Sequence, residues 1–119
     1  MTTYWRKQIQ GNLHIIDDGV AESRTLLAVP ELEELQEAVR GYIEQIPYFD
    51  IYEGQPCIAF CNEEAKIHGF PYNHPANRAW RIAFKAATGK TPEPDYLVGP
   101  IAIVTGDEEF LERAVSYET

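Results

Sequence analysis

The sequence predicts an α+β protein: a small single domain with a mostly antiparallel sheet of about five strands and two to three helices. Its length of 119 residues suits one hydrophobic core. Its apolar fraction of 45% and its charged fraction of 24% are ordinary for a globular protein, and 14 aromatic residues argue against disorder. Strand and helix patterns follow one another in the order ββ-α-ββ-α-β-α, without repeats or a linker.

The first part of the chain predicts an arm and two strands. Residues 1–11 are mostly polar and are expected to form a short N-terminal arm, with the single domain at 12–119. Residues 13–16 and 25–29 are expected to form two short strands, and Asp-Asp-Gly at 17–19 is a turn signal between them.

The next elements are a helix and two strands. Pro30 suits the first position of a helix, the apolar side chains after it share one face, and Gly41 is expected to end the helix. Residues 42–49 alternate and predict a strand. Residues 57–61 form a short apolar run that is typical of a buried strand, and 62–76 are expected to be irregular.

The last third predicts a helix, a strand and a second helix. Residues 75–88 carry an apolar stripe and are expected to form a helix that ends before Gly89. Residues 97–104 predict a strand, which Pro100 places at an edge or a bulge of the sheet. Thr105 and Glu108 fit a capping box for a helix at 107–115. The expected core comprises Leu35, Val39, Ile43, Ile58, Phe60, Trp80, Phe84, Ile101 and Ile103.

Two cysteines predict free thiols. On one strand, Cys57 and Cys61 would face the same way about 13 Å apart, beyond the reach of a disulfide. We expect buried thiols in a cytoplasmic protein. No recognised zinc spacing joins them to the nearby histidines, so no metal and no cofactor is expected.

The net charge disfavours two classes of function. A net charge of −9 disfavours a general DNA-binding or membrane-surface protein. No apolar run approaches the roughly 18 residues of a membrane span, and the first residues lack the apolar region of a signal peptide. We therefore expect a cytoplasmic protein without a membrane partner.

Positive charge gathers in one segment. Residues 65–92 contain five lysines and arginines and no acid, whereas 1–64 hold twelve acids against four bases. Arg78, Arg81 and Lys85 are spaced to share one helix face, with aromatic residues nearby. Such a face can bind a phosphate-bearing or other anionic ligand. More often, such a face pairs with the protein's own acids or remains solvated.

The signs of catalysis are weak. Glu63 and Glu64 could act as acid and base, or bind a metal, if a turn made them converge, although solvated acids in a turn are more frequent. No nucleophile elbow, phosphate-binding loop or metalloprotease motif is present, and no Ser or Cys is placed beside a His. We therefore predict that the protein is not an enzyme.

Three segments together resemble a family of small phage and bacterial proteins, the domain of unknown function 3846. They are LEELQEAVRGYIE at 32–44, NEEAKI at 62–67 with GFPYN and AN after it, and VGPIAIV at 98–104. The chain departs from the family pattern at Arg40 and Ala65, where Gly is usual, and at Asn77, where Thr is usual. The resemblance implies a phage or mobile-element setting and no established chemistry.

The leading hypothesis is a non-catalytic accessory protein that binds a host protein or a small anionic, nucleotide-like ligand, to counter host defence. The residues assigned to binding are Arg40, Tyr42, Asn62, Glu63, Lys66, Asn73, Arg78 and Arg81. Lys66, Arg78 and Arg81 would meet negative charge, and Tyr42 would stack. The two asparagines would either bind polar groups or brace the loop between them.

Two alternatives remain open. An acidic surface could mimic nucleic acid and inhibit a host enzyme, because four glutamates coat the first expected helix. A small hydrolase could use Glu63 and Glu64. We also expect self-association along an edge at the Pro100 strand.

Overall fold

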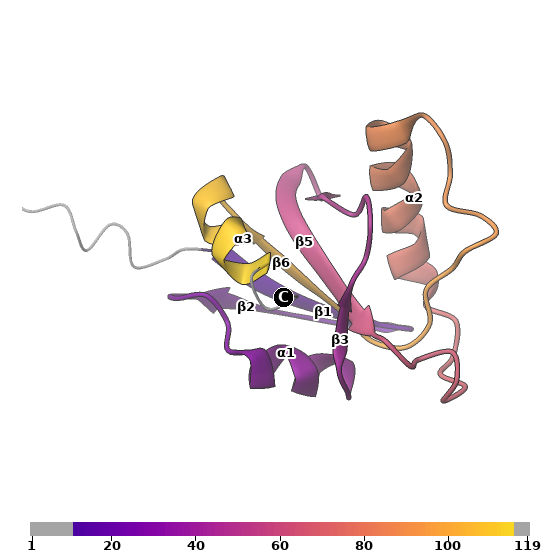
Figure 1. The fold of residues 1–119 in the computed structure, drawn as a ribbon, viewed down its shortest axis with the longest axis horizontal. Helices are drawn as coiled ribbons and strands as arrows, with labels where there is room; N and C mark the ends of the chain where they lie inside the picture. Colours follow the sequence, from indigo (N-terminus) through magenta and orange to yellow (C-terminus); the bar gives the residue numbers. More distant parts are fainter. Residues whose placement is uncertain (1–10, 116–119) are drawn as a thin grey trace, which may run out of the picture.

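The structure is a computed structural model that describes residues 11–115. The expected arm lies outside the described residues except for Gly11, which begins the first strand. Figure 1 shows the elements in chain order. They are β1 (Gly11–Asp17), β2 (Val20–Leu26), α1 (Leu32–Val39), β3 (Ile43–Gln45), β4 (Ile51–Tyr52), β5 (Gln55–Asn62), α2 (His74–Thr88), β6 (Ile101–Gly106) and α3 (Glu108–Val115).

The six strands form an antiparallel sheet, which confirms the predicted α+β class. Five strands lie in the order β2-β1-β6-β5-β3, and the short β4 pairs with β5. Every pairing is antiparallel. Because β6 lies between β1 and β5, it connects the hairpin of β1 and β2 to the strands from the middle of the sequence.

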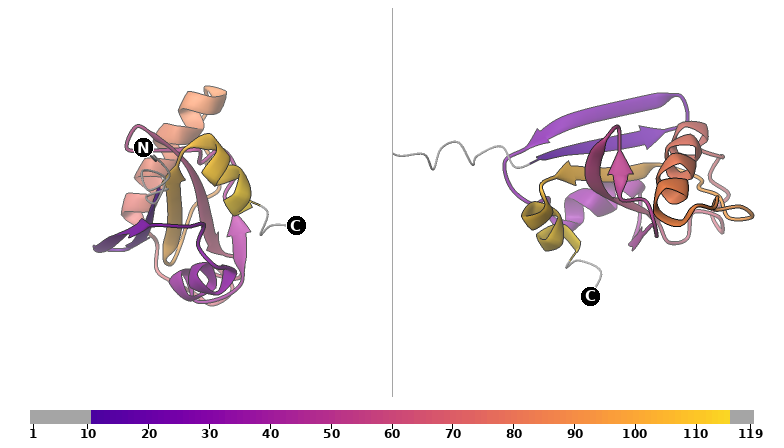
Figure 2. Two further views of the ribbon diagram at one scale, coloured as in Figure 1. Left: turned by 90° about the vertical axis from the view of Figure 1, so that its left-hand side faces the viewer. Right: turned by 90° about the horizontal axis from the view of Figure 1, so that it is seen from above.

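Helices cover both faces of the sheet (Figure 2). On one face, Ile101 and Ile103 of β6 pack in a cluster that includes Trp80 of α2. On the other face, the alternate β6 residues pack in a second cluster with side chains of α1 and α3, among them Leu35 and Phe110. Residues 101–105 are consequently all buried, because a strand covered on both faces has no solvent-facing side.

The expectation that the Pro100 strand is an edge was wrong. Pro100 stands just before β6, which lies between β1 and β5. Proline needs no ladder hydrogen bond at that position, so it is tolerated at the entrance of a central strand. The two edges of the sheet are β2 and β3.

The cap of α3 also differs from the prediction. Thr105 is buried within β6, and the side chain of Asp107 accepts a hydrogen bond from the Phe110 N–H at 2.9 Å. Asp107 is thus the residue that caps α3, because its carboxylate reaches an otherwise unpaired N–H of the first turn.

Several strands have different bounds from those expected; β6, for example, begins at Ile101 and not at residue 97. A two-residue turn with Gly19 at φ 80° pairs Asp17 with Val20, so the second strand starts at Val20 and not at Thr25. The strand expected at 42–49 is limited to β3, because Pro47 lacks an N–H and Tyr48 adopts φ 59°. Six of the nine expected core residues are buried, and Ile43, Ile58 and Phe84 are partly buried.

The C-cap of α1 is Arg40 and not Gly41. Arg40 has φ 65° and ψ 38°, the left-handed conformation that favours glycine. We expect Arg40→Gly to raise the free energy of unfolding by up to about 1 kcal/mol, because the relief of this strain exceeds the added entropy of the unfolded chain. Its exposed side chain is 3.7 Å from Asp17, a contact of small value.

Chemical denaturation measures this effect. Arg40→Ala is the matched control, since it removes the same side chain but keeps a Cβ in the left-handed conformation. The glycine variant should be more stable than both the alanine variant and the wild type. Equal stability of the two variants would contradict it.

Candidate functional site

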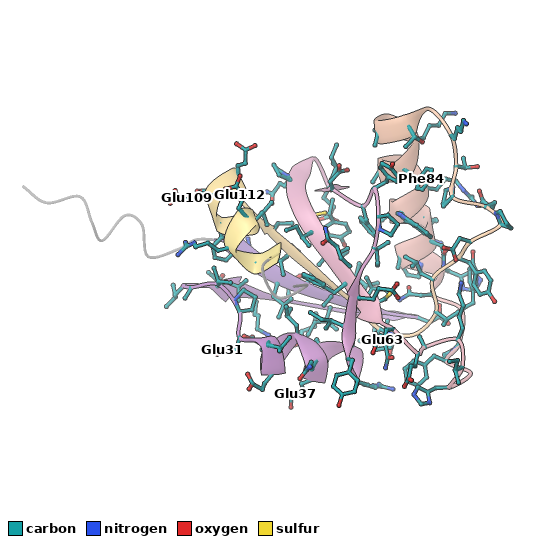
Figure 3. All side chains as sticks on the ribbon, viewed as in Figure 1. Glu31, Glu37, Glu63, Phe84, Glu109 and Glu112 are labelled. Carbon is teal, nitrogen blue, oxygen red and sulfur yellow. The ribbon has the colours of Figure 1, made fainter. Side chains whose placement is uncertain are left out.

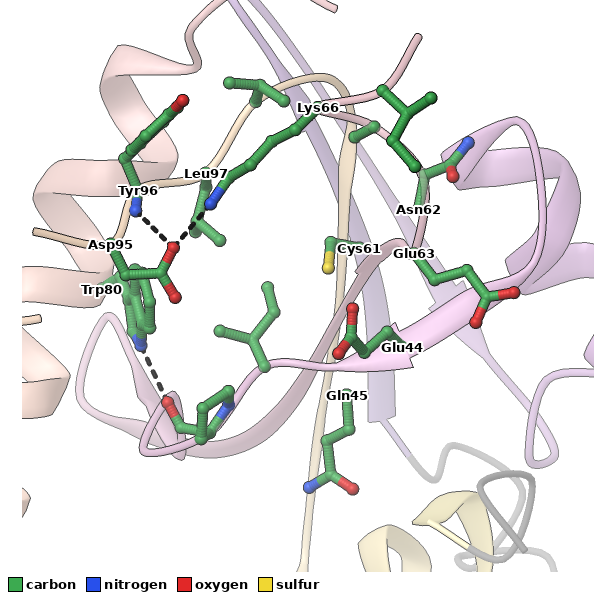
Figure 4. A pocket seen from close by; sticks show the side chains of 15 residues that line it. Glu44, Gln45, Cys61, Asn62, Glu63, Lys66, Trp80, Asp95, Tyr96 and Leu97 are labelled. Atoms are coloured by element: carbon green, nitrogen blue, oxygen red, sulfur yellow. Dashed lines mark hydrogen bonds and ion pairs between the residues drawn. The ribbon is translucent and has the colours of Figure 1, made fainter.

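The candidate site is a cavity of about 160 Å³ beside the edge strand β3. Figure 4 shows that its walls come from separate parts of the chain. They are residues 44–47 from β3 onward, residues 61–67 at the end of β5 and beyond, Trp80 of α2, and residues 95–98 before β6.

The floor of the cavity is apolar and well packed. Ile46, Trp80 and Leu97 line it and are each at least 94% buried. The indole N–H of Trp80 donates a hydrogen bond to the Pro47 carbonyl at 2.8 Å. Because this bond satisfies the polar edge of the indole, the ring presents a fixed apolar surface to the cavity.

One side of the rim is acidic. Glu44 of β3 and Glu63, just after β5, both line the cavity and are both exposed. Figure 4 shows them across the cavity from Asp95 and Tyr96. Within residues 11–115, neither carboxylate has a hydrogen bond or an ion pair. Both are therefore available to a ligand.

The opposite side of the rim is neutral overall. Lys66 Nζ lies 2.7 Å from Asp95 Oδ1 and 4.2 Å from the centre of the Tyr96 ring. The hydrogen bond from Lys66 holds the pKa of Asp95 below its ordinary value. Lys66 and Asp95 compensate each other, so the cavity rim has a net negative charge from Glu44 and Glu63.

Asn62 has a structural role at the end of the cavity. Its side-chain N–H groups donate to the carbonyls of Val39 at 3.2 Å and Arg40 at 3.0 Å, and its Oδ1 accepts from the Glu64 N–H at 2.8 Å. A Cβ at Gly41 would lie 2.6 Å from the Asn62 nitrogen, so only glycine leaves room for this contact. Asn62 thereby ties the end of α1 to the end of β5.

Asn73 has a second structural role, away from the cavity. It is fully buried, and its amide donates to the carbonyls of Ile16 at 3.0 Å and Gly99 at 2.8 Å. Its Oδ1 accepts from the Ala76 N–H at 3.1 Å and so caps α2. The contacts of Asn73 fit the bracing role, because its side-chain donors and acceptor meet backbone groups.

Most of the other residues assigned to binding lie away from the cavity. Arg40 caps the C-terminus of α1, Tyr42 is 68% exposed outside the cavity lining, and Arg78 is exposed on α2. Arg81 forms an ion pair with Glu93. Of the eight assigned residues, the structure brings only Asn62, Glu63 and Lys66 together around the cavity.

Sequence reasoning missed Glu44, Asp95 and Tyr96 as rim residues. Glu44 belongs to the segment that carries the family resemblance, and it pairs in register with Cys61 of β5, which also lines the cavity. The pairing of these two strands could have identified it. For Asp95 and Tyr96 there was no signal, because only the folded loop brings them to Lys66.

The two thiols differ in their surroundings. Both belong to the same face of β5, as predicted. Burial, with a smaller contribution from Asp50, raises the pKa of Cys57 to about 12, and its thiol donates to the Phe49 carbonyl. Cys61 is half-buried and lines the cavity. Cys57 is thus a buried thiol, as expected, whereas Cys61 is less buried than expected.

The paired glutamates do not form a joint site. Glu63 lines the cavity, whereas Glu64 is outside the lining and lies 3.5 Å from His68. Among residues 11–115, no cluster of three or more His, Cys, Asp or Glu side chains could hold a metal ion. Glu63 and Glu64 therefore do not converge as a carboxylate pair for acid–base catalysis.

The expectation that no Ser lies beside a His was wrong. Register pairing of β1 with β2 puts Ser23 Oγ 2.7 Å from His14 Nδ1. The other ring nitrogen is 3.3 Å from the Thr105 hydroxyl, where a catalytic triad would have a carboxylate. Burial lowers the pKa of His14, and Glu53 opposes this effect. The contact is a cross-strand hydrogen bond without a triad's third member.

Comparison with known proteins gives one assignment. No helix within residues 11–115 combines the length and hydropathy needed to cross a bilayer. No curated protein and no solved structure matches the chain. The family described as Domain of unknown function (DUF3846) matches residues 12–115, which is most of the chain, and no catalytic family is indicated. The chain therefore belongs to the DUF3846 family.

Proposed function

We propose that this chain is a non-catalytic binding module whose cavity takes one apolar side chain from a positively charged segment of a partner protein. The observation that carries the proposal is the apolar cavity and its rim. Two acids of the rim have no partner among the described residues, while its lysine is already bound to Asp95.

The size of the cavity favours a single side chain. An apolar cavity of about 150 Å³ holds one benzene ring, whereas sites for whole small molecules occupy about 300–1,000 Å³. The value of about 160 Å³ therefore suits one ring or one branched aliphatic group. Protein interfaces commonly gain most of their affinity from such anchors in desolvated pockets.

The charges favour a cationic partner over an anionic ligand. Glu44 and Glu63 repel a phosphate at the rim, and the whole chain has a net charge of −9. Two of the three cations assigned to an anion, Lys66 and Arg81, are held by Asp95 and Glu93. Complementary charge would also steer a basic partner toward the site.

The family resemblance supplies a setting for this proposal. It implies a phage or mobile-element accessory protein, and the partner is then a host protein. Sequestering a host protein in this way would counter host defence, with the chain acting in the host cytoplasm.

A titration with benzylamine tests the location of the site. This probe combines one ring with one positive charge, and amide NMR of the full chain reports where it binds. We expect the largest shifts at Ala65, Leu97 and Val98, which line the cavity. Cys61→Leu should abolish these shifts by filling the cavity. Largest shifts on α2 around Arg78, or full binding by the leucine variant, would contradict the proposal.

A second candidate, a nucleic-acid mimic, is favoured by the two helices on one face of the sheet. Glu31 at the N-cap of α1, Glu37 of α1, and Glu109 and Glu112 of α3 are exposed, and Figure 3 shows them at the surface. Such a mimic would bind a basic protein through these acids and would be insensitive to Cys61→Leu. The cavity variant therefore distinguishes the two functions.

A further inference from the structure

The edge strand β2 has an unusual degree of exposure. It is seven residues long, and only its last residue, Leu26, is buried. It pairs with β1 on one side and forms the outer edge of the sheet, as Figure 2 shows. The opposite edge, β3, is only three residues long. A long open edge can accept another strand, whereas a very short one is protected.

The backbone N–H and C=O groups of β2 point alternately toward β1 and toward the open side. The two-residue turn makes Asp17 and Val20 a hydrogen-bonded pair, and hydrogen-bonded and non-bonded pairs then alternate along the hairpin. The N–H and C=O groups of Val20, Glu22 and Arg24 therefore point toward β1. Those of Ala21, Ser23 and Thr25 point away from it, toward the open side.

The sequence of β2 is chemically self-complementary. In V-A-E-S-R-T-L, Ser23 is the centre, and Glu22 and Arg24 stand at equal distances on either side. If two such strands pair in antiparallel fashion about Ser23, each Glu22 lies opposite the other copy's Arg24. These are non-bonded pairs, in which the side chains are closest. Cross-strand pairs of opposite charge are stabilising.

We propose that two copies of this chain pair through their β2 strands, antiparallel and centred on Ser23, to extend the sheet across a twofold axis. The outward groups of Ala21, Ser23 and Thr25 would then form the new backbone ladder. Within one chain, the Arg24 guanidinium lies 2.8 Å from the Glu22 carboxylate and 3.1 Å from the Glu34 carboxylate. These contacts hold the Arg24 side chain on the face of the sheet where Glu22 of the second copy would lie. This surface is separate from the cavity and does not depend on the proposed binding function.

Charge exchange at the edge tests the proposal. Sedimentation equilibrium of the full chain should show a monomer–dimer equilibrium for the wild type between roughly 1 µM and 1 mM. Each dimer would contain two pairs between residue 22 of one copy and residue 24 of the other. Glu22→Arg alone, or Arg24→Glu alone, places like charges in both pairs and should weaken the dimer at least about tenfold. The double variant restores opposite charges and should dimerise like the wild type.

A second variant separates pairing from folding. Ser23→Pro removes an N–H that faces away from β1, so the monomer should still fold while the dimer is lost. Because Arg24→Glu also loses the contact with Glu34, thermal melting at low concentration checks the fold of every variant. A wild type that stays monomeric, single variants that dimerise normally, or a double variant that fails to recover would each overturn the proposal.

Discussion

Replacing Asn73 by alanine is expected to lower the free energy of unfolding by about 4 kcal/mol. The change leaves the buried carbonyls of Ile16 and Gly99 without this donor, which costs about 1–3 kcal/mol for each such group. It also removes the cap of α2, which is worth about 1 kcal/mol. Denaturant unfolding measures the loss, and a decrease below about 1 kcal/mol would show that the amide does not brace these elements.

Asn73→Asp is the matched control for the donor groups. The carboxylate keeps the acceptor for the Ala76 N–H but faces the two carbonyls with negative charge. Protonation restores one donor, so the folded state of this variant binds the proton more tightly than the unfolded state. Its stability should therefore rise as the pH falls toward the acidic range, whereas the alanine variant should show no such gain over the wild type.

Phe60→Ala is expected to cost about 3–5 kcal/mol, because it empties a fully buried site in the cluster beneath α1 and α3. Phe84→Ala is the matched control, because it makes the same substitution at a different site. Phe84 is only partly buried, against Trp80 and Tyr48, so its truncation should cost clearly less than that of Phe60. Equal losses at the two positions, measured by denaturant unfolding, would contradict the assigned packing.

Local chemistry made the helices and most strands of this fold predictable. The apolar stripe within residues 75–88 and the glycine at 89 placed α2 to within a residue, because both signals act within a few turns. The order of the strands was not predictable in this way. Pro100 is compatible both with an edge and with the start of a central strand, and only the pairing of β6 with β1 and β5 distinguishes them.

The candidate site was only partly predictable for a related reason. Asn62, Glu63 and Lys66 are neighbours in sequence and were singled out together. The same residues acquire their chemistry from partners far along the chain: Asp95 neutralises Lys66, and Glu44 adds the second free acid. Lys66, the cation of the basic segment that lines the cavity, therefore adds no uncompensated positive charge to the rim.

The charge preference of the cavity is the most direct test of the central claim. Calorimetric titration should show that benzylamine binds the wild type more tightly than benzoate, and that salt reduces the difference. Glu44→Gln with Glu63→Gln should remove the preference, whereas Glu33→Gln with Glu37→Gln, an equal change of net charge on α1, should preserve it. Tighter binding of benzoate by the wild type, or equal effects of the two double variants, would contradict an acidic rim that selects cationic partners.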